Sequence, residues 1–236
     1  MPVRSKWQSL PTEAINSATL RIDKLSAADI VEAMLNEDRK MLVAVQHEKE
    51  RIAVGIDIIT QALRKGGRIV FVGAGTSGRL GVVESAEMPP TFGTPPELVQ
   101  AIMAGGKDAV LGAKEGVEDN YEEGARSINR IKPSKQDVVI GVSASGMTRF
   151  VNGALTRARR AGSKIIFVTC DPHTELQMFV DLTIAPAVGP EVIAGSTRLK
   201  AGTATKLVLN MLTTADWRLV RTDRRLTTVI AFPVWS

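Results

Sequence analysis

The chain has 236 residues, of which 44% are hydrophobic, so it is long enough to bury one substantial core. Its single cysteine, Cys170, excludes an internal disulfide, and two histidines argue against a histidine-rich metal site. The net charge of +5 comes with only 4% aromatic residues, so we interpret it as a solvated surface and expect no nucleic-acid partner. No apolar run reaches membrane-spanning length and residues 1–7 lack a signal peptide's apolar core, so we expect a cytoplasmic protein without membrane contact.

The N-terminal part of the chain predicts an arm followed by two helices. Residues 10–25 are polar and irregular, and Ser26-x-x-Asp29 matches a capping box that opens a short helix to about residue 35. A long helix is predicted from Glu37 or Asp38 to Lys65. Its apolar positions share one helical face and are Leu42, Val45, Ile52, Ile56, Ile59 and Leu63. This face suits either a dimer interface or packing on a sheet.

A strand, a glycine loop and a helix follow in direct succession. Arg68 to Val72 is a β-branched apolar run, typical of a buried parallel strand. Gly73, Gly75 and Gly78 then let the backbone turn sharply and approach a ligand. The helix is predicted from about Ser77 until Pro89-Pro90 stops it. Backbone N–H groups at such a helix N-terminus suit a phosphate.

The same glycines, Gly73-x-Gly75-x-x-Gly78, also fit a dinucleotide-binding fingerprint. A nicotinamide site needs an acidic residue at the tip of the next strand, and the predicted strand from Leu98 to Ala104 ends without one. The loop also carries the hydroxyls of Thr76 and Ser77 and the cation Arg79, which are groups for a terminal phosphate. The alternative that this glycine loop is a turn with a purely structural role also stays open.

Four further strands alternate with helices and predict an α/β fold with a doubly wound, parallel, five-stranded sheet flanked by helices. These strands are expected at about 98–104, 137–142, 164–169 and 181–185. The segment from Asp108 to Ile131 is expected to be helical, in two pieces around Gly116. Cys170 ends one strand, where we expect a small buried residue rather than a nucleophile.

A second hydroxyl-rich loop follows the strand at 137–142. Ser143, Ser145 and Thr148 surround Gly146 at the start of the next helix and form a second anion cradle at the same edge of the sheet. Two such loops favour a small phosphorylated ligand between them. Ser196-Thr197-Arg198 is predicted to open another helix, where Arg198 or Lys200 either approaches the anion or is simply exposed.

These residues resemble known families. Ser143-x-Ser145-Gly146-x-Thr148 resembles the phosphosugar loop of sugar isomerase (SIS) domains. Three runs are more specific and resemble the N-acetylmuramic acid 6-phosphate etherase family, namely residues 73–81, 87–93 and 195–204. The resemblance covers roughly residues 12–214, in order and without large gaps. It implies an SIS-type fold, with N-terminal helices, and a lyase that needs neither cofactor nor metal.

The reaction that the resemblance implies is loss of D-lactate from C3 of N-acetylmuramic acid 6-phosphate, followed by addition of water, in amino-sugar and cell-wall recycling. Glu87 matches the family's proton donor and Glu118 matches its second active-site glutamate, which would serve as base. Their neighbours Glu84 and Glu115 have similar spacing, so spacing alone does not select the pair. The implied substrate contacts are Gly75, Thr76, Ser77, Ser143, Ser145, Gly146 and Thr148.

Two other functions stay open, a non-catalytic phosphosugar-binding regulator similar to glucokinase regulatory protein and a phosphosugar isomerase. SIS-type sites are commonly completed by a neighbouring subunit, so a homodimer is expected.

The expected organisation is an N-terminal arm with a short helix at 1–37, an SIS domain at 38–214 and an atypical tail at 215–236. The tail departs from the family's pattern, in which that helix continues and a small helical C-terminal domain follows. It carries Trp217, Trp235 and the apolar run Val229 to Phe232, and is expected to pack poorly and to reduce stability and activity.

Overall fold

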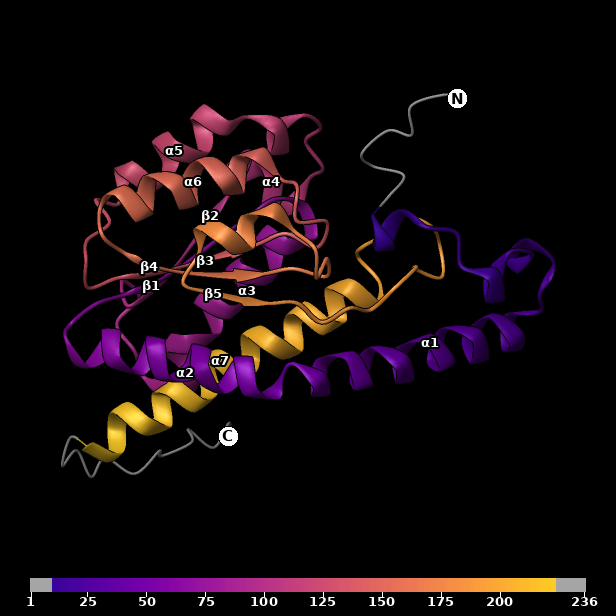
Figure 1. The fold of residues 1–236 in the computed structure, drawn as a ribbon, viewed down its shortest axis with the longest axis horizontal. Helices are drawn as coiled ribbons and strands as arrows, with labels where there is room; N and C mark the ends of the chain where they lie inside the picture. The colour runs from indigo at the N-terminus through magenta and orange to yellow at the C-terminus, as the bar shows by residue number, and fades with distance from the viewer. Residues whose placement is uncertain (1–9, 224–236) are drawn as a thin grey trace, which may run out of the picture.

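The computed structural model describes the backbone of residues 10–223 and the side chains as far as Asp216. Five parallel strands form one sheet in the order β2-β1-β3-β4-β5 (Figure 1). The strands are β1 (Ile69–Gly73), β2 (Val99–Met103), β3 (Val138–Val142), β4 (Lys164–Val168) and β5 (Leu182–Ile184). All five predicted strands and the doubly wound α/β fold are therefore confirmed.

Helices cover both faces of the sheet because successive strand residues point to opposite sides. Ile69 and Phe71 of β1 enter one apolar cluster, whereas Val70 and Val72 enter the other. The first cluster is covered by α2 (Lys49–Arg64), α3 (Gly75–Phe92) and α7 (Lys200–Asp223). The second is covered by α5 (Tyr121–Arg130) and α6 (Arg149–Arg160), which lie together above the sheet in Figure 1.

The predicted division of the N-terminal helices is wrong. α1 runs without a break over Ala27–His47, and the chain turns at Glu48 before α2 begins. The buried Glu48 carboxylate explains this turn, because it accepts the N–H of Ala185 beyond β5 at 3.0 Å and the Arg51 guanidinium at 2.8 Å. Of the predicted apolar face, Leu42 is 54% exposed, whereas Val45 and four residues of α2 pack in or against the core.

The predicted ends of α3 also change. Pro89 and Pro90 do not stop this helix, which begins at Gly75 and continues to Phe92. It ends at Gly93 in the left-handed conformation (φ 65°), whose N–H donates to the Pro89 carbonyl at 2.8 Å. Proline removes a donor from the helix but leaves its own carbonyl available, so the last turn can still close.

Short elements complete the described chain. The N-terminal arm forms three 3₁₀ turns, η2 (Pro11–Glu13), η3 (Ser17–Thr19) and η4 (Ile22–Lys24). After β2 come α4 (Asp108–Leu111) and η5 (Val117–Asp119), and η6 (Glu175–Phe179) precedes β5. Gly116, with φ 74°, separates α4 from η5 and α5, close to the predicted division.

The expected domain limits at 37/38 and 214/215 fall inside α1 and α7. The apolar run Val229 to Phe232 lies outside the described residues, as does Trp235. No helix within residues 10–223 has both the length and the apolar character needed to cross a bilayer.

Candidate functional site

The site is positioned by the order of the strands. β1 and β3 are neighbours, yet α3 leaves β1 toward one face of the sheet and α6 leaves β3 toward the other. The register pairs Gly73 with Val142, so the two following loops start side by side. In open parallel sheets such a reversal of strand order creates a crevice at the carboxyl edge, where ligands bind. The two predicted loops therefore meet at the switch point of this fold.

The first loop depends on its glycines. A Cβ on Gly73 would lie 2.6 Å from the Gly78 nitrogen, and Gly75 has φ +52°. The N-cap of α3 is Ala74, and no described side chain caps the helix. The first-turn N–H groups of α3 consequently face the crevice beside the half-buried hydroxyls of Thr76 and Ser77.

The second loop is held together by its own hydroxyls. The Oγ atoms of Ser143 and Thr148 are 2.8 Å apart, and Ser145 Oγ accepts the Met147 N–H at 3.3 Å. Gly146 has φ +73° and packs so closely on Thr174 that an added Cβ would lie 2.9 Å from its hydroxyl oxygen. Because the Thr148 hydroxyl is used in this way, it makes no cap on α6.

Helices α2 and α4 also begin without a side-chain cap, but three other helix N-termini in the described chain are occupied by side chains. Ser26 caps α1 and Asn120 caps α5 through their side-chain oxygens. The fully buried Glu191 carboxylate accepts the N–H groups of Lys200 and Ala201 and so fills the N-terminus of α7. The ends of α3 and α6 are thus available to an anion, and each carries the partial positive charge of a helix N-terminus.

Arg79 and Lys200, two of the three cations that the sequence suggested for the anion, have partners in the described chain. The guanidinium of Arg79, predicted as a phosphate group, instead donates to the carbonyls of Val110 and Ala109, both at 2.8 Å, and ties α4 to α3. Lys200 is buried and forms an ion pair with Glu37 of α1.

The third cation, Arg198, is exposed and lies in a turn, because α7 begins at Lys200 and not at Ser196 as predicted. This turn is close to the first loop, since a Cβ on Gly202 would lie 3.4 Å from Thr76.

Glu118 lies at the carboxyl edge. It belongs to η5, and its neighbour Val117 packs near Gly105, directly after β2, where an added Cβ would be 3.5 Å away. Its side chain is exposed.

Glu87 lies elsewhere in the same subunit. It sits on α3 more than three turns after Gly75, about 18 Å along the helix axis. Gly81 contacts Phe71, so α3 runs back along the sheet and carries the exposed Glu87 toward the amino edge. One subunit does not bring Glu87 and Glu118 together.

Their neighbours differ in burial. Glu84 is buried between α3 and α7, where the Thr213 hydroxyl donates to it at 2.9 Å and Lys206 lies 3.9 Å away. Burial raises the pKa of the Glu84 carboxyl. Glu115 is exposed. Sequence spacing does not distinguish Glu84 from Glu87. In the structure Glu84 is a buried carboxylate that holds two helices together, whereas Glu87 faces solvent.

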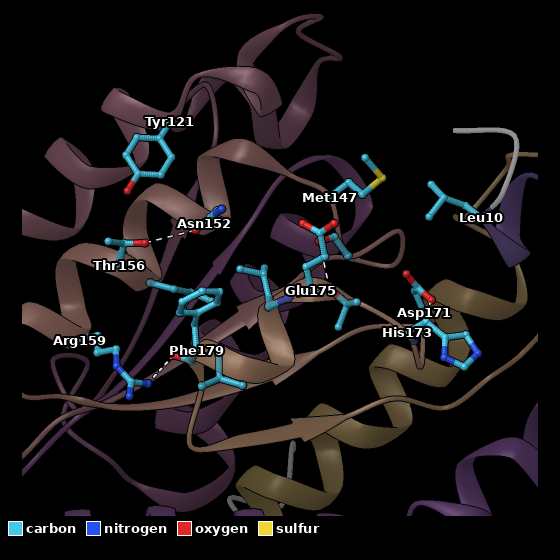
Figure 2. A pocket seen from close by; sticks show the side chains of 15 residues that line it. Leu10, Tyr121, Met147, Asn152, Thr156, Arg159, Asp171, His173, Glu175 and Phe179 are labelled. Carbon is cyan, nitrogen blue, oxygen red and sulfur yellow. Dashed lines mark hydrogen bonds between the residues drawn. The ribbon is translucent and has the colours of Figure 1, made fainter. Parts of the chain in front are cut away.

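A cavity of about 670 Å³ opens beside the second loop, on the α6 side of the sheet (Figure 2). Gly146 and Met147 form its border with the crevice, and Asn152, Thr156 and Arg159 line it from α6. Sequence reasoning missed this lining. Its only signal is the four-residue spacing of Asn152 and Thr156, which places both on one face of α6.

Strand order, a loop at each side of the switch point and two open helix N-termini define an α/β domain of the SIS class. Residues 51–159 match the glucokinase regulatory protein N-terminal SIS domain, and residues 121–215 match the SIS domain. A phosphoheptose isomerase from Francisella tularensis superposes with a TM-score of 0.64 at 16% identity, over 82% of this chain and 100% of that one. The Neisseria gonorrhoeae enzyme gives 0.61 at 18% identity, over 81% and 99%. These likenesses show the fold.

Curated relatives show the family, and the chain belongs to the N-acetylmuramic acid 6-phosphate etherases. The protein of that name from Clostridium acetobutylicum is 48% identical over 213 residues, which are 90% of this chain and 70% of that one. The Salinibacter ruber protein is 50% identical over 88% of this chain and 67% of its own length. The Rhodopirellula baltica protein is 48% identical over 89% and 70%.

Proposed function

We propose that this chain is a carbon–oxygen lyase of the hydro-lyase class that cleaves the D-lactyl ether of N-acetylmuramic acid 6-phosphate. The products are N-acetylglucosamine 6-phosphate and D-lactate, which assigns the reaction to N-acetylmuramate breakdown and cell-wall recycling. The observation that carries this proposal is the 43–50% identity to proteins of that name over about nine-tenths of the chain.

The phosphosugar is proposed to bind in the crevice between the two loops. The phosphate would accept N–H groups from the uncapped starts of α3 and α6, which is how helix N-termini bind anions. The contacts are Gly75, Thr76, Ser77, Ser143, Ser145, Gly146 and Thr148, as predicted from the sequence. Hydroxyls of both loops then orient the sugar.

The reaction divides two proton transfers between two carboxyl groups. Glu118, as base, removes the C2 proton of the open-chain aldehyde, which is acidic because it lies next to the carbonyl. The C3–O bond then breaks as a C2–C3 double bond forms, and Glu87, as acid, protonates the departing lactate oxygen. Water then adds across the double bond, with its oxygen bound to C3 and a proton returned to C2, to give the product. The proposal assigns no metal and no redox cofactor to these steps.

A non-catalytic phosphosugar-binding regulator is the second candidate, because residues 51–159 match the SIS domain of glucokinase regulatory protein. The presence of both Glu87 and Glu118 favours the enzyme. An isomerase is supported only by structures at 16–18% identity, which share the fold.

We also propose that the chain forms a homodimer. In Figure 1 the first half of α1 stands away from the sheet, and it exposes apolar side chains there, with Val31 57% and Leu35 47% exposed. Apolar surface of this kind is typical of a protein interface. A cytoplasmic location stays a prediction, consistent with the single reduced Cys170.

The deciding experiment incubates the protein with N-acetylmuramic acid 6-phosphate and no added cofactor, and measures D-lactate. Elimination through C2 also predicts solvent deuterium at C2 of the product. Glu87→Gln and Glu118→Gln should each lower the rate by about 10²–10⁴-fold. The control, Glu115→Gln, should keep wild-type activity. Tight sugar-phosphate binding without lactate release would instead identify the regulator.

A further inference from the structure

We infer that the N-terminal arm is part of the phosphosugar site, and that Glu13 on this arm binds hydrogen-bond donors of the sugar. The two loops hold the phosphate, whereas the arm supplies a wall that contacts the sugar itself. This inference rests on the proposed function for the position of the phosphate. It adds a segment that neither SIS match covers, because those matches begin at residues 51 and 121.

The arm has a fixed position although its backbone is irregular. The Gly195 N–H donates to the Thr12 carbonyl at 3.2 Å, and the Thr19 hydroxyl donates to the Val192 carbonyl at 2.8 Å. Both bonds tie the arm to the same short segment before α7. Thr12 is fully buried and Thr19 is 6% exposed, so the arm is packed into the structure and is not a loose extension.

This position is the outer side of the crevice. Leu10 lines the cavity together with Gly146 and Met147 of the second loop, and Figure 2 shows Leu10 at the same end as Met147. Glu13 follows three residues later and lies against Gly195. In Figure 1 the arm lies beyond the carboxyl ends of the strands. The arm therefore starts beside the second loop and continues to the turn that begins at Gly195.

That turn borders the first loop. A Cβ on Gly202 would lie 3.3 Å from the Thr197 carbonyl oxygen and 3.4 Å from the Thr76 methyl group. Since three residues of chain span at most about 10 Å, the step from Leu10 to Glu13 is short. The arm thus passes from the surroundings of one loop to those of the other, across the outside of the crevice.

Glu13 brings a carboxylate without a protein partner to this place. A Cβ on Gly195 would lie only 2.7 Å from Glu13 Oε2, so the carboxylate fills the space that a larger residue would need. The half-buried Glu13 side chain forms no hydrogen bond or ion pair with another described residue. The hydroxyl of Thr12, directly before it, is buried and also lacks a described partner. Buried polar groups nearly always have partners, so these two neighbours together indicate a ligand.

The chemistry of a carboxylate selects the part of the ligand that Glu13 binds. An ionised carboxylate only accepts hydrogen bonds, and its charge repels both the phosphate and the lactyl carboxylate. The sugar hydroxyls and the acetamido N–H are the donors that remain. With the phosphate at the uncapped starts of α3 and α6, the sugar extends outward from the crevice and toward the arm.

Calorimetry with two probes tests the inference. Glu13→Ala should raise the Kd for N-acetylglucosamine 6-phosphate by at least about tenfold, because it removes hydrogen bonds to a charged group. Glu13→Gln keeps the size of the side chain and should raise this Kd by about threefold or more, since hydrogen bonds to an ionised group are about twice as strong as neutral ones. Both variants should bind inorganic phosphate as tightly as wild type, measured by displacement. The control Asp23→Ala removes an exposed acid of the same arm and should bind both probes normally.

Two results would overturn the inference. Unchanged sugar-phosphate affinity in Glu13→Ala would exclude a contact, and an equal loss of inorganic phosphate binding would show that Glu13 only supports the loops. Hydrogen exchange gives a further readout, because the Gly195 amide, which donates to the arm, should exchange more slowly with N-acetylglucosamine 6-phosphate but not with inorganic phosphate. None of these assays needs turnover. If the wild-type protein binds the sugar phosphate in this way but releases no D-lactate, the proposed lyase function fails and the role of Glu13 stands.

Discussion

Ser143 and Ser145 stand only two positions apart but have different surroundings. Ser143 is buried and paired with Thr148, whereas Ser145 is half-buried and accepts a backbone N–H of its own loop. Ser143 thus shapes the loop, and Ser145 keeps a half-buried hydroxyl beside it. In the proposed phosphosugar site, Ser143 would act through the geometry of the loop and Ser145 through direct contact with the ligand.

Replacing these serines should weaken sugar-phosphate binding. Ser145→Ala removes the proposed hydrogen bond to a charged group, worth about 1.5–3 kcal/mol, and Ser143→Ala removes the bond to Thr148 that shapes the loop, so Ser143→Ala/Ser145→Ala should raise the Kd for N-acetylglucosamine 6-phosphate by at least about tenfold. Titration calorimetry measures this Kd. Ser127→Ala on α5, whose hydroxyl donates to Glu123 and accepts from Arg130, is the matched control and should bind normally. Unchanged affinity in the double variant would remove the second loop from the site.

Asp216 predicts a pH dependence of stability. It is only 1% exposed, and burial, opposed by the Thr60 hydroxyl and reinforced by Asp57, raises its pKa from 3.8 to about 8. Between these two pH values the unfolded chain loses this proton while the folded chain keeps it. The free energy of unfolding should therefore be fully supported below about pH 4 and fall as the pH rises to about 8.

Asp216→Asn should remove this dependence and stabilise the protein at pH 8. Since one pKa unit corresponds to about 1.4 kcal/mol, the gain should exceed about 1 kcal/mol at pH 8 and vanish near pH 4. Urea unfolding at both pH values measures it. Asp119→Asn, an exposed substitution of the same charge, controls for net charge. A variant that is less stable than wild type at pH 8 would show that the carboxylate is ionised in the fold.

At the scale of elements, a buried ionic cluster fixes α1 to the start of α7. Lys200 pairs with Glu37, which also accepts from Lys40, while Glu191 caps the same end of α7. Burial opposes ionisation of Glu37, but its hydrogen bonds to Lys200 and Lys40 outweigh that effect and hold its pKa below the usual value. The cluster sets where α7 begins, and thereby where the turn before it meets the first loop.

Removing one partner of the Lys200–Glu37 ion pair should destabilise the fold. Glu37→Gln leaves the Lys200 ammonium buried without a counter-charge, which should lower the free energy of unfolding by about 3–5 kcal/mol. Removing both charges, in Glu37→Met/Lys200→Met, should recover much of the loss. Glu32→Gln breaks an exposed ion pair with Arg39 and should change stability by less than about 1 kcal/mol. Denaturant unfolding would contradict this if the single Glu37 variant matched wild type.

Sequence reasoning located the elements well but not their limits. The strands are found within two residues because short apolar runs between turns identify them. The turn at Glu48 is missed because its cause is a contact with Ala185, distant in the sequence. Arg79 is misjudged for a similar reason, since the carbonyls that hold it belong to α4. Local sequence patterns do not show contacts between residues that are far apart in the chain.

At the scale of the whole molecule, the two proposed catalytic glutamates, Glu87 and Glu118, lie toward opposite edges of the sheet. The two loops are predictable, because parallel strands bring their carboxyl ends to one edge. The distance between Glu87 and Glu118 is not, since it depends on the direction in which α3 runs along the sheet and not on the spacing of motifs. Family resemblance identifies both glutamates without saying that they face opposite edges.

Alkylation of Cys170 can report local unfolding of the core around β4. Cys170 lies two residues after the end of β4 and is fully buried, and burial together with the Glu191 charge raises its pKa to about 12. Because the thiolate is the reactive form, an alkylating reagent at neutral pH can modify this residue only when the core around β4 becomes exposed. As the sequence contains one cysteine, the alkylation rate of the unaltered chain reports the frequency of that opening alone. The resting protein should accordingly keep its thiol through oxidising conditions that consume exposed cysteines within minutes.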